Sequence, residues 1–260
     1  EMTSSLVGSE MCIRDRLLQR MDYSGKFFPD MQPLNVFVVA LIAMLVCAAF
    51  GTVTGFFIAY LNVPPFIATL AMMEIVYGIG LIVTNATPLG GYVEQYTNVS
   101  NGKFLGINYL IWIAIIVAAI TWFIFNMTRH GKYMYAIGGN PQAAEVAGVP
   151  VKATMILIYM KAAAMYGLAG FMLGAKAGGA SVQTGYGYEM EAIAACTIGG
   201  VSVTGGRGKV SSAIIGVAVF ELLKVALQYL GMNANAQYIA IGVVIFVAIS
   251  LDIRKYIARK

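Results

Sequence analysis

Runs of apolar residues long enough to cross a bilayer are the feature that most constrains this chain. A spanning helix needs ~20 mainly apolar residues, because each residue adds about 1.5 Å along the helix axis. The composition agrees with several such helices, since 59% of the residues are hydrophobic and 11% are charged. We interpret six stretches as spans, at about 34–60, 66–84, 107–127, 153–175, 211–230 and 237–251. The sequence therefore predicts an all-α polytopic membrane protein.

A further apolar stretch, from Glu189 to Gly200, is too short to span alone. As a helix it would cover ~18 Å of a hydrocarbon core of about 30 Å. It leads into residues 199–209, here called the glycine loop, whose glycines break helical structure. We predict a broken span over residues 189–210, which brings the total to about seven. Non-helical backbone at that depth must be buried or line a water-filled cavity. The candidate pathway residues are Gly199, Gly200, Ser202, Gly205 and Gly206.

Residues 129–152, here called the polar island, interrupt the apolar pattern between the third and fourth spans. The island is too polar for lipid and too short for a domain, which predicts a loop on one membrane face. Asparagine caps helices well and proline suits the first helical position, so we predict a turn and then a short helix over 142–147. Its small side chains would let another protein approach closely, although an ordinary loop between spans is the alternative. The residues assigned to this contact are Gly138, Gly139, Asn140, Pro141, Ala143, Ala144 and Gly148.

The distribution of basic residues indicates the orientation of the chain. Seven alternating crossings place nine lysines and arginines on the island's side and four on the other side. This excess predicts that the polar island and the C terminus are cytoplasmic, and it favours the broken span over a re-entrant hairpin. No basic cluster among aromatic residues indicates a nucleic-acid partner. The nine are Arg129, Lys132, Lys152, Arg207, Lys209, Arg254, Lys255, Arg259 and Lys260, and the four are Arg20, Lys26, Lys103 and Lys176.

Four charged residues stand inside apolar runs: Glu74, Lys161, Glu221 and Lys224. A lone charge at the centre of a spanning helix costs about 2.5–3.5 kcal/mol, so these groups need partners or water. Glu221 and Lys224 are three residues apart and can pair on one helix face. We hypothesise that Lys161 bridges spans to Glu74 or Glu221. The functional alternative for this possible charge network is a proton relay, as in an ion-coupled secondary transporter.

The sequence carries no pattern for catalysis or metal binding. The three cysteines and the single histidine share no metal-ligand spacing. The glycine loop fails the Walker pattern, because Val210 follows Lys209 where serine or threonine is required. We therefore expect no enzymatic activity, no metal site and no cofactor bound by this chain.

Four motifs together resemble permease subunits of ABC importers for ribose, xylose and galactose. They are AYLNVPPFIATLAMMEIVYG from residue 59, YAIGGNPQAAEVAGVPV in the polar island, EMEAIAACTIGGVSVTGGRG in the broken span and GMNANAQY before the last span. They follow the order and spacing of that family from Leu17 to Lys260, and the likeness is greatest to its galactose and methyl-galactoside branch. Ala71 and Thr54 depart from the family pattern, which has glycine and asparagine there.

The resemblance implies a transport subunit that works by alternating access. It implies a second permease copy, cytoplasmic ATPase domains that bind the ATP and dock on the polar island, and a periplasmic sugar-binding protein. It also implies a location in the bacterial inner membrane, with lipid around the spans, and some ten spans, of which about three would precede this chain.

Residues 1–16 resemble a translated sequencing adapter more than a signal peptide, so we expect them to be non-native. The layout is then a periplasmic loop at 17–33, three spans within 34–128, the cytoplasmic coupling loop at 129–152, four spans within 153–252 and a cytoplasmic tail at 253–260.

Overall fold

The computed structural model of the protein describes residues 18, 35–85, 87, 92, 94–179, 181, 184–185, 187–202 and 205–257. The chain divides into two compact units. The first comprises Glu1–Val117 with Lys152–Tyr186, and the second comprises Ala118–Val151 with Gly187–Lys260. The predicted non-native segment and the loop at 17–33 lie outside the described residues, apart from Leu18.

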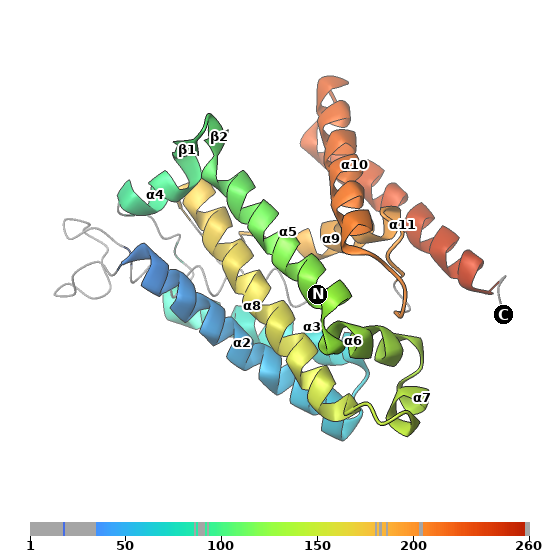
Figure 1. The fold of residues 1–260 in the computed structure, drawn as a ribbon. Coiled ribbons are helices and arrows are strands. Elements are labelled where there is room, and N and C mark those ends of the chain that lie inside the picture. Colours follow the sequence, from blue (N-terminus) through green and yellow to red (C-terminus); the bar gives the residue numbers. More distant parts are fainter. Residues whose placement is uncertain are drawn as a thin grey trace. The chain divides into compact units, whose positions relative to one another are not determined.

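Five helices are long and apolar enough to cross a membrane (Figure 1). They coincide with five predicted spans, with every bound within two residues of the predicted one, and they make the chain a multi-pass membrane protein. The apolar part of α11 (Ala234–Ile257) covers only Asn235–Ala248, and α9 (Tyr188–Ile198) is shorter still, so a total of seven spans stays a prediction. The five are α2 (Val36–Leu61), α3 (Pro65–Thr84), α5 (Tyr109–Met127), α8 (Val151–Ala177) and α10 (Val210–Tyr229).

Local sequence sets the bounds of α2 and α3. The Asn35 side chain caps α2 by accepting a hydrogen bond from the Phe37 amide at 3.0 Å. Asn62 ends α2 in the left-handed region at φ 53°, which asparagine tolerates better than most residues. Pro65 then occupies the first turn of α3, where its missing amide proton is not needed.

In the first unit, α2 and α8 run antiparallel in close contact (Figure 1). A Cβ atom added to Gly51 would lie 2.5 Å from the Ala163 Cβ, and one added to Gly55 would lie 2.9 Å from the Ile156 Cα. Gly51 and Gly55 form a GxxxG pair, a pattern that lets membrane helices approach backbone to backbone. Thr54 lies buried between them, and its hydroxyl donates to the Phe50 carbonyl of its own helix at 3.0 Å.

The segment after α3 contains a short helix, α4 (Glu94–Asn101). The Tyr96 hydroxyl of α4 is fully buried and donates to the Phe171 carbonyl of α8 at 2.6 Å. A two-residue hairpin follows, in which β1 (Lys103–Phe104) pairs antiparallel with β2 (Ile107–Asn108). Leu105 and Gly106 both have positive φ, as a type I′ turn requires. This hairpin is a short local feature of a fold that is otherwise helical, as the sequence predicts.

In the second unit, α9, α10 and α11 form a helical cluster. Ala194 and Ala195 of α9 are buried against Phe220 of α10 and Ile241 of α11. The helix α11 continues to Ile257, beyond the predicted end of the last span at 251, and residues 258–260 of the tail lie outside the described residues.

Candidate functional site

The polar island contains the short capped helix that the sequence predicts. Asn140 is the N-cap of helix α7 (Pro141–Val146), and its side chain accepts a hydrogen bond from the Ala143 amide at 3.0 Å. It ends in a Schellman motif, because Val149 donates to Ala144 and Gly148 donates to Glu145, both at 3.0 Å. Gly148 has φ 81°, the left-handed conformation that this motif requires. The cap, the first-position proline and the terminating glycine therefore act as predicted.

The two alanines singled out as a contact surface differ in exposure. Ala143 is exposed, whereas Ala144 is 4% exposed and is unavailable to a partner in this conformation. Val146, at the end of the same helix, is 91% exposed. A single exposed valine is common on protein surfaces and does not identify a contact by itself. Within α7 only Ala144 is buried, so a docking protein could reach the side chains of the other five residues: Pro141, Gln142, Ala143, Glu145 and Val146.

The predicted turn at Gly138, Gly139 and Asn140 is shorter than expected. Helix α6 (Arg129–Gly139) runs through both glycines, and only Asn140 has extended backbone, with φ −160° and ψ 106°. The Thr128 side chain caps α6 by accepting a hydrogen bond from the Gly131 amide at 3.2 Å. Gly131 packs against the carbonyls of Ile124 and Phe125, so α6 turns tightly on the end of α5. The local pattern favours a turn at these glycines, but Gly138 packs against Gly206, a partner far away in the sequence that the local pattern cannot reveal.

The structure brings the polar island and the glycine loop together. A Cβ atom added to Gly138 would lie 2.5 Å from the Gly206 amide nitrogen. A Cβ added to Gly205 would lie 2.9 Å from the Gly138 carbonyl oxygen, and one added to Gly206 would lie 2.8 Å from the Gly139 nitrogen. Backbone therefore touches backbone at this point, which only glycine allows. Two sets of residues that the sequence singled out separately form one site.

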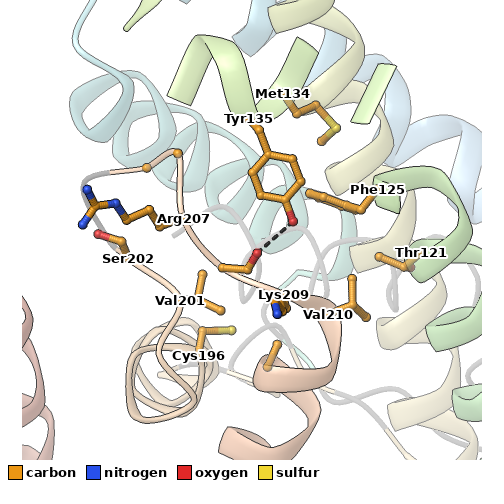
Figure 2. A pocket seen from close by; sticks show the side chains of 14 residues that line it. Thr121, Phe125, Met134, Tyr135, Cys196, Val201, Ser202, Arg207, Lys209 and Val210 are labelled. Carbon is orange, nitrogen blue, oxygen red and sulfur yellow. Dashed lines mark hydrogen bonds between the residues drawn. The ribbon is translucent and has the colours of Figure 1, made fainter. Parts of the chain in front are cut away.

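A cavity of about 340 Å³ lies beside this contact (Figure 2). Tyr135 of α6 reaches into it and donates a hydrogen bond from its hydroxyl to the Gly208 carbonyl at 2.8 Å. The Tyr135 ring meets the Phe125 ring edge to face, with 5.8 Å between ring centroids. Cys196 and Val201 line the cavity from the α9 side, and the Arg207 side chain is directed away from Tyr135 (Figure 2).

In the segment predicted to be a broken span, a short helix is followed by non-helical backbone. Helix α9 ends at Ile198, Gly200 has φ 88°, and α10 begins only at Val210. A hydrogen bond from the Ser202 amide to the Arg207 carbonyl, at 3.1 Å, closes the glycine loop. A pathway lined by Gly199, Gly200, Ser202, Gly205 and Gly206 stays a prediction.

Gly199 instead has a clear packing role. A Cβ atom there would collide with the Ser212 carbonyl of α10, and a Cβ on Gly216 would collide with the Ala195 carbonyl of α9. The α9 end and the first half of α10 therefore lie in backbone contact, so the glycine loop joins two helices that are packed tightly together.

The charged residues within apolar runs are paired differently from the hypothesis. Lys224 contacts Glu221 at 3.7 Å, as its spacing predicts, but its shorter contact is to Glu191 of α9, at 2.8 Å. Glu74 and Lys161 lie in the first unit and form no ion pair with each other. A bridge from Lys161 to Glu221 would join the two units and stays a prediction.

The Lys224 and Glu191 pair gives a first testable expectation. Both side chains are about three-quarters buried, at 24% and 23% exposure. Lys224→Met should lower the free energy of unfolding by about 1–3 kcal/mol, because it leaves the Glu191 carboxylate without its partner. Thermal unfolding of the purified protein in detergent measures this. The double variant Glu191→Gln with Lys224→Met should recover most of the loss.

Glu221→Gln is the matched control for this pair. Its side chain is 59% exposed and more distant, so its loss should change the free energy by less than about 0.5 kcal/mol. An equal effect of Glu221→Gln and Lys224→Met would show that the short contact to Glu191 contributes no more to the free energy of unfolding than the longer contact to Glu221.

Sequence reasoning missed four residues of this site: Gly131, Tyr135, Glu191 and Gly216. Glu191 carries a signal that could have been used, since it is an acidic residue in an apolar stretch with a basic residue in the next span. Gly216 stands inside an apolar run, where a small residue indicates close helix packing. Tyr135 has no such signal, because its partner is a backbone carbonyl 73 residues away.

Comparison of the sequence with known proteins places the chain in a transport family. Residues 12–249 match the model of a family described as branched-chain amino acid transport system / permease component. No solved structure matches the chain.

Three curated relatives show where the similarity lies. The galactose/methyl galactoside import permease protein MglC of Escherichia coli strain K12 is 39% identical over 98% of this chain and 78% of the relative. The protein of the same name from Treponema pallidum is 37% identical over 90% of this chain and 46% of that relative. The ribose import permease protein RbsC of Escherichia coli strain K12 is 35% identical over 85% of this chain and 70% of that relative. Because the family model covers most of its length, the chain belongs to the family of branched-chain amino acid transport system / permease components.

Proposed function

We propose that this chain is the membrane-spanning permease subunit of an ATP-driven importer of galactose or methyl galactosides. The observation that carries the proposal is the 39% identity to the galactose/methyl galactoside permease over 98% of the chain. The described helices support it, because five of them suit a bilayer and the polar regions between them include a compact capped helix.

A sugar is favoured over the amino acids in the family description. The relatives with the greatest coverage of this chain carry sugars in their names, and galactosides rank above ribose in both identity and coverage. Galactose and methyl galactosides are therefore the first substrates to test, with ribose second.

The partners in this proposal follow from the importer class. A cytoplasmic ATPase subunit binds and hydrolyses the ATP, a periplasmic protein delivers the sugar, and a second permease copy completes the pathway. The chain lies in the inner membrane with its C terminus in the cytoplasm, and it has no catalytic residue, metal or cofactor of its own. The ATPase docks on α7 of the polar island, where Ala143 is exposed.

The ion-coupled alternative has weaker support. Its proposed relay needs Glu74, Lys161 and Glu221 to communicate, yet Glu74 and Lys161 form no ion pair and the nearest base to Glu221 is engaged with Glu191. Membership in a family of transport-system permease components favours a permease that works with separate energising subunits.

Sugar uptake in reconstituted vesicles tests the proposal. The chain, its ATPase subunit and its sugar-binding protein are reconstituted, and entry of radiolabelled D-galactose, methyl β-D-galactoside, D-ribose and L-leucine is measured. We expect galactoside uptake that requires internal ATP and binding protein and that survives an uncoupler. Uptake driven by an ion gradient without ATP would overturn the importer class, and preferred uptake of ribose or leucine would overturn the substrate.

A further inference from the structure

We propose that Tyr135 and Gly138 are positioning residues that carry movement of the polar island into the α9–α10 pair. This inference rests on the proposed function, because it explains how an ATPase docked on α7 could act on helices that it does not touch. Neither residue contacts substrate or nucleotide in this scheme, and the pair acts through the glycine loop.

The first step of the path joins α7 to α6. The Asn140 amide donates to the Ala136 carbonyl of α6 at 3.0 Å, and the Asn140 carbonyl accepts from the Ala144 amide of α7 at 3.0 Å. The Asn140 side chain adds a third bond, to the Ala143 amide. Asn140 is thus hydrogen-bonded to both helices. A displacement of α7 is therefore transmitted to α6 through this residue.

The second step joins α6 to the glycine loop. Gly138 lies against Gly205 and Gly206 with no side chain between the two backbones. Gly205 has φ 91° and Gly206 has φ 71°, conformations that other residues rarely adopt. Backbone contacts of this kind transmit displacement directly, because there is no side chain that could change rotamer and absorb it.

Tyr135 fixes the same two elements one helical turn earlier. Its hydroxyl holds the Gly208 carbonyl, and its ring is backed by Phe125 at the end of α5. Gly208 immediately precedes Lys209, the N-cap residue of α10. This hydrogen bond therefore attaches α6 to the glycine loop at the point where the loop continues into α10. The steric contact of Gly138 moves the loop when α6 advances toward it, and the hydrogen bond from Tyr135 moves the loop when α6 withdraws.

The last step joins the loop to the helices. The bond from Ser202 to Arg207 closes the loop, and Gly199 and Gly216 lock the end of α9 onto α10. The loop, α9 and α10 therefore form a single packed element at the end of the path. A displacement of α6 reaches both helices together.

Gly138→Ala and Gly139→Ala make a matched pair of variants for this proposal. They place the same methyl group on adjacent residues of α6, but Gly138 meets Gly206 at 2.5 Å, whereas nothing lies within 4 Å of a Cβ on Gly139. In vesicles with ATPase and binding protein, Gly138→Ala should lower ATP-dependent galactoside uptake by at least about tenfold, because overpacking shifts α6 from the loop. The sequence assigned both glycines to the docking contact, but they lie in α6, outside the α7 surface proposed here for docking. ATP hydrolysis in the absence of binding protein and co-purification of the ATPase should therefore stay unchanged. Gly139→Ala should behave as wild type.

Tyr135→Phe provides a milder test that preserves packing. Losing the hydroxyl should lower uptake about fivefold, the equivalent of one intramolecular hydrogen bond. Tyr133→Phe, on the same helix, is the control and should leave uptake unchanged. Both variants should melt within a few degrees of wild type.

A reporter on the loop separates transmission from a general structural effect. Arg207 is exposed, so Arg207→Cys in a background without native cysteines can be labelled with a thiol reagent. Its labelling rate should differ between nucleotide-free and ATP-trapped complexes. Tyr135→Phe and Gly138→Ala should abolish that difference, whereas Tyr133→Phe and Gly139→Ala should keep it.

The outcomes distinguish the two proposals. If the unaltered complex shows no ATP-dependent uptake, the proposed function fails. If it transports and both Gly138→Ala and Tyr135→Phe keep normal uptake and nucleotide-dependent labelling, the transmission path is wrong. A loss of uptake accompanied by equal losses of melting temperature and ATPase binding would show a structural role alone, and would also overturn the inference.

Discussion

Gly216→Ala should cause the largest loss of stability of any single methyl group added to the described glycines. The new Cβ would collide with the Ala195 carbonyl of α9 and would also lie 2.7 Å from the Gly199 amide nitrogen. Both obstacles are backbone atoms, which cannot rotate aside as a flexible side chain can. We expect the free energy of unfolding to fall by about 3 kcal/mol or more, at or above the upper end of the range for overpacked cores.

Thermal unfolding in detergent measures this loss, and Gly242→Ala is its control. Gly242 is also a helical glycine in the same unit, but nothing lies within 4 Å of a Cβ there. Alanine is the better helix former by about 1 kcal/mol, so the control should be neutral or slightly stabilising. Equal melting temperatures for the two variants would contradict the close approach of α9 and α10.

Ala143→Arg should abolish most ATP-dependent uptake while leaving the permease folded. Ala143 is exposed on α7, and its hydrogen bonds are made by its backbone alone: its amide donates to the Asn140 cap and its carbonyl accepts from the Ala147 amide. A large charged side chain would hold a docking ATPase away from the helix. We expect uptake to fall by at least about 30-fold, which corresponds to roughly 2 kcal/mol at the centre of an interface.

Ala143→Ser is the control, because it keeps the side chain small and uncharged. Uptake and ATPase co-purification are measured for both variants beside the melting temperature. The buried Ala144 is unsuitable for this test, since a bulky residue there would disturb folding as well as docking. Normal uptake by Ala143→Arg would remove the coupling role from α7.

Local sequence signals predicted the local features of the site well. The Asn140 cap, Pro141 and the left-handed Gly148 each act within one turn of α7, so their patterns can be read without knowledge of the rest of the fold. The end of α9 at Ile198 was equally predictable, because the glycines that stop it follow at once. The same reasoning misread Gly138 and Gly139, which lie inside α6.

The sequence by itself determined that this is a multi-pass helical membrane protein with a capped polar island and an interrupted span. Those features follow from the length of apolar runs and from short-range backbone preferences, both of which depend only on residues close together in the sequence. Only the tertiary structure decided that Gly138 meets Gly206, that Tyr135 holds Gly208 and that Lys224 pairs with Glu191. These contacts join residues 33 to 73 positions apart, and glycine and backbone carbonyls leave no periodic or charge pattern that names a distant partner. The packing of whole helices selects the partners.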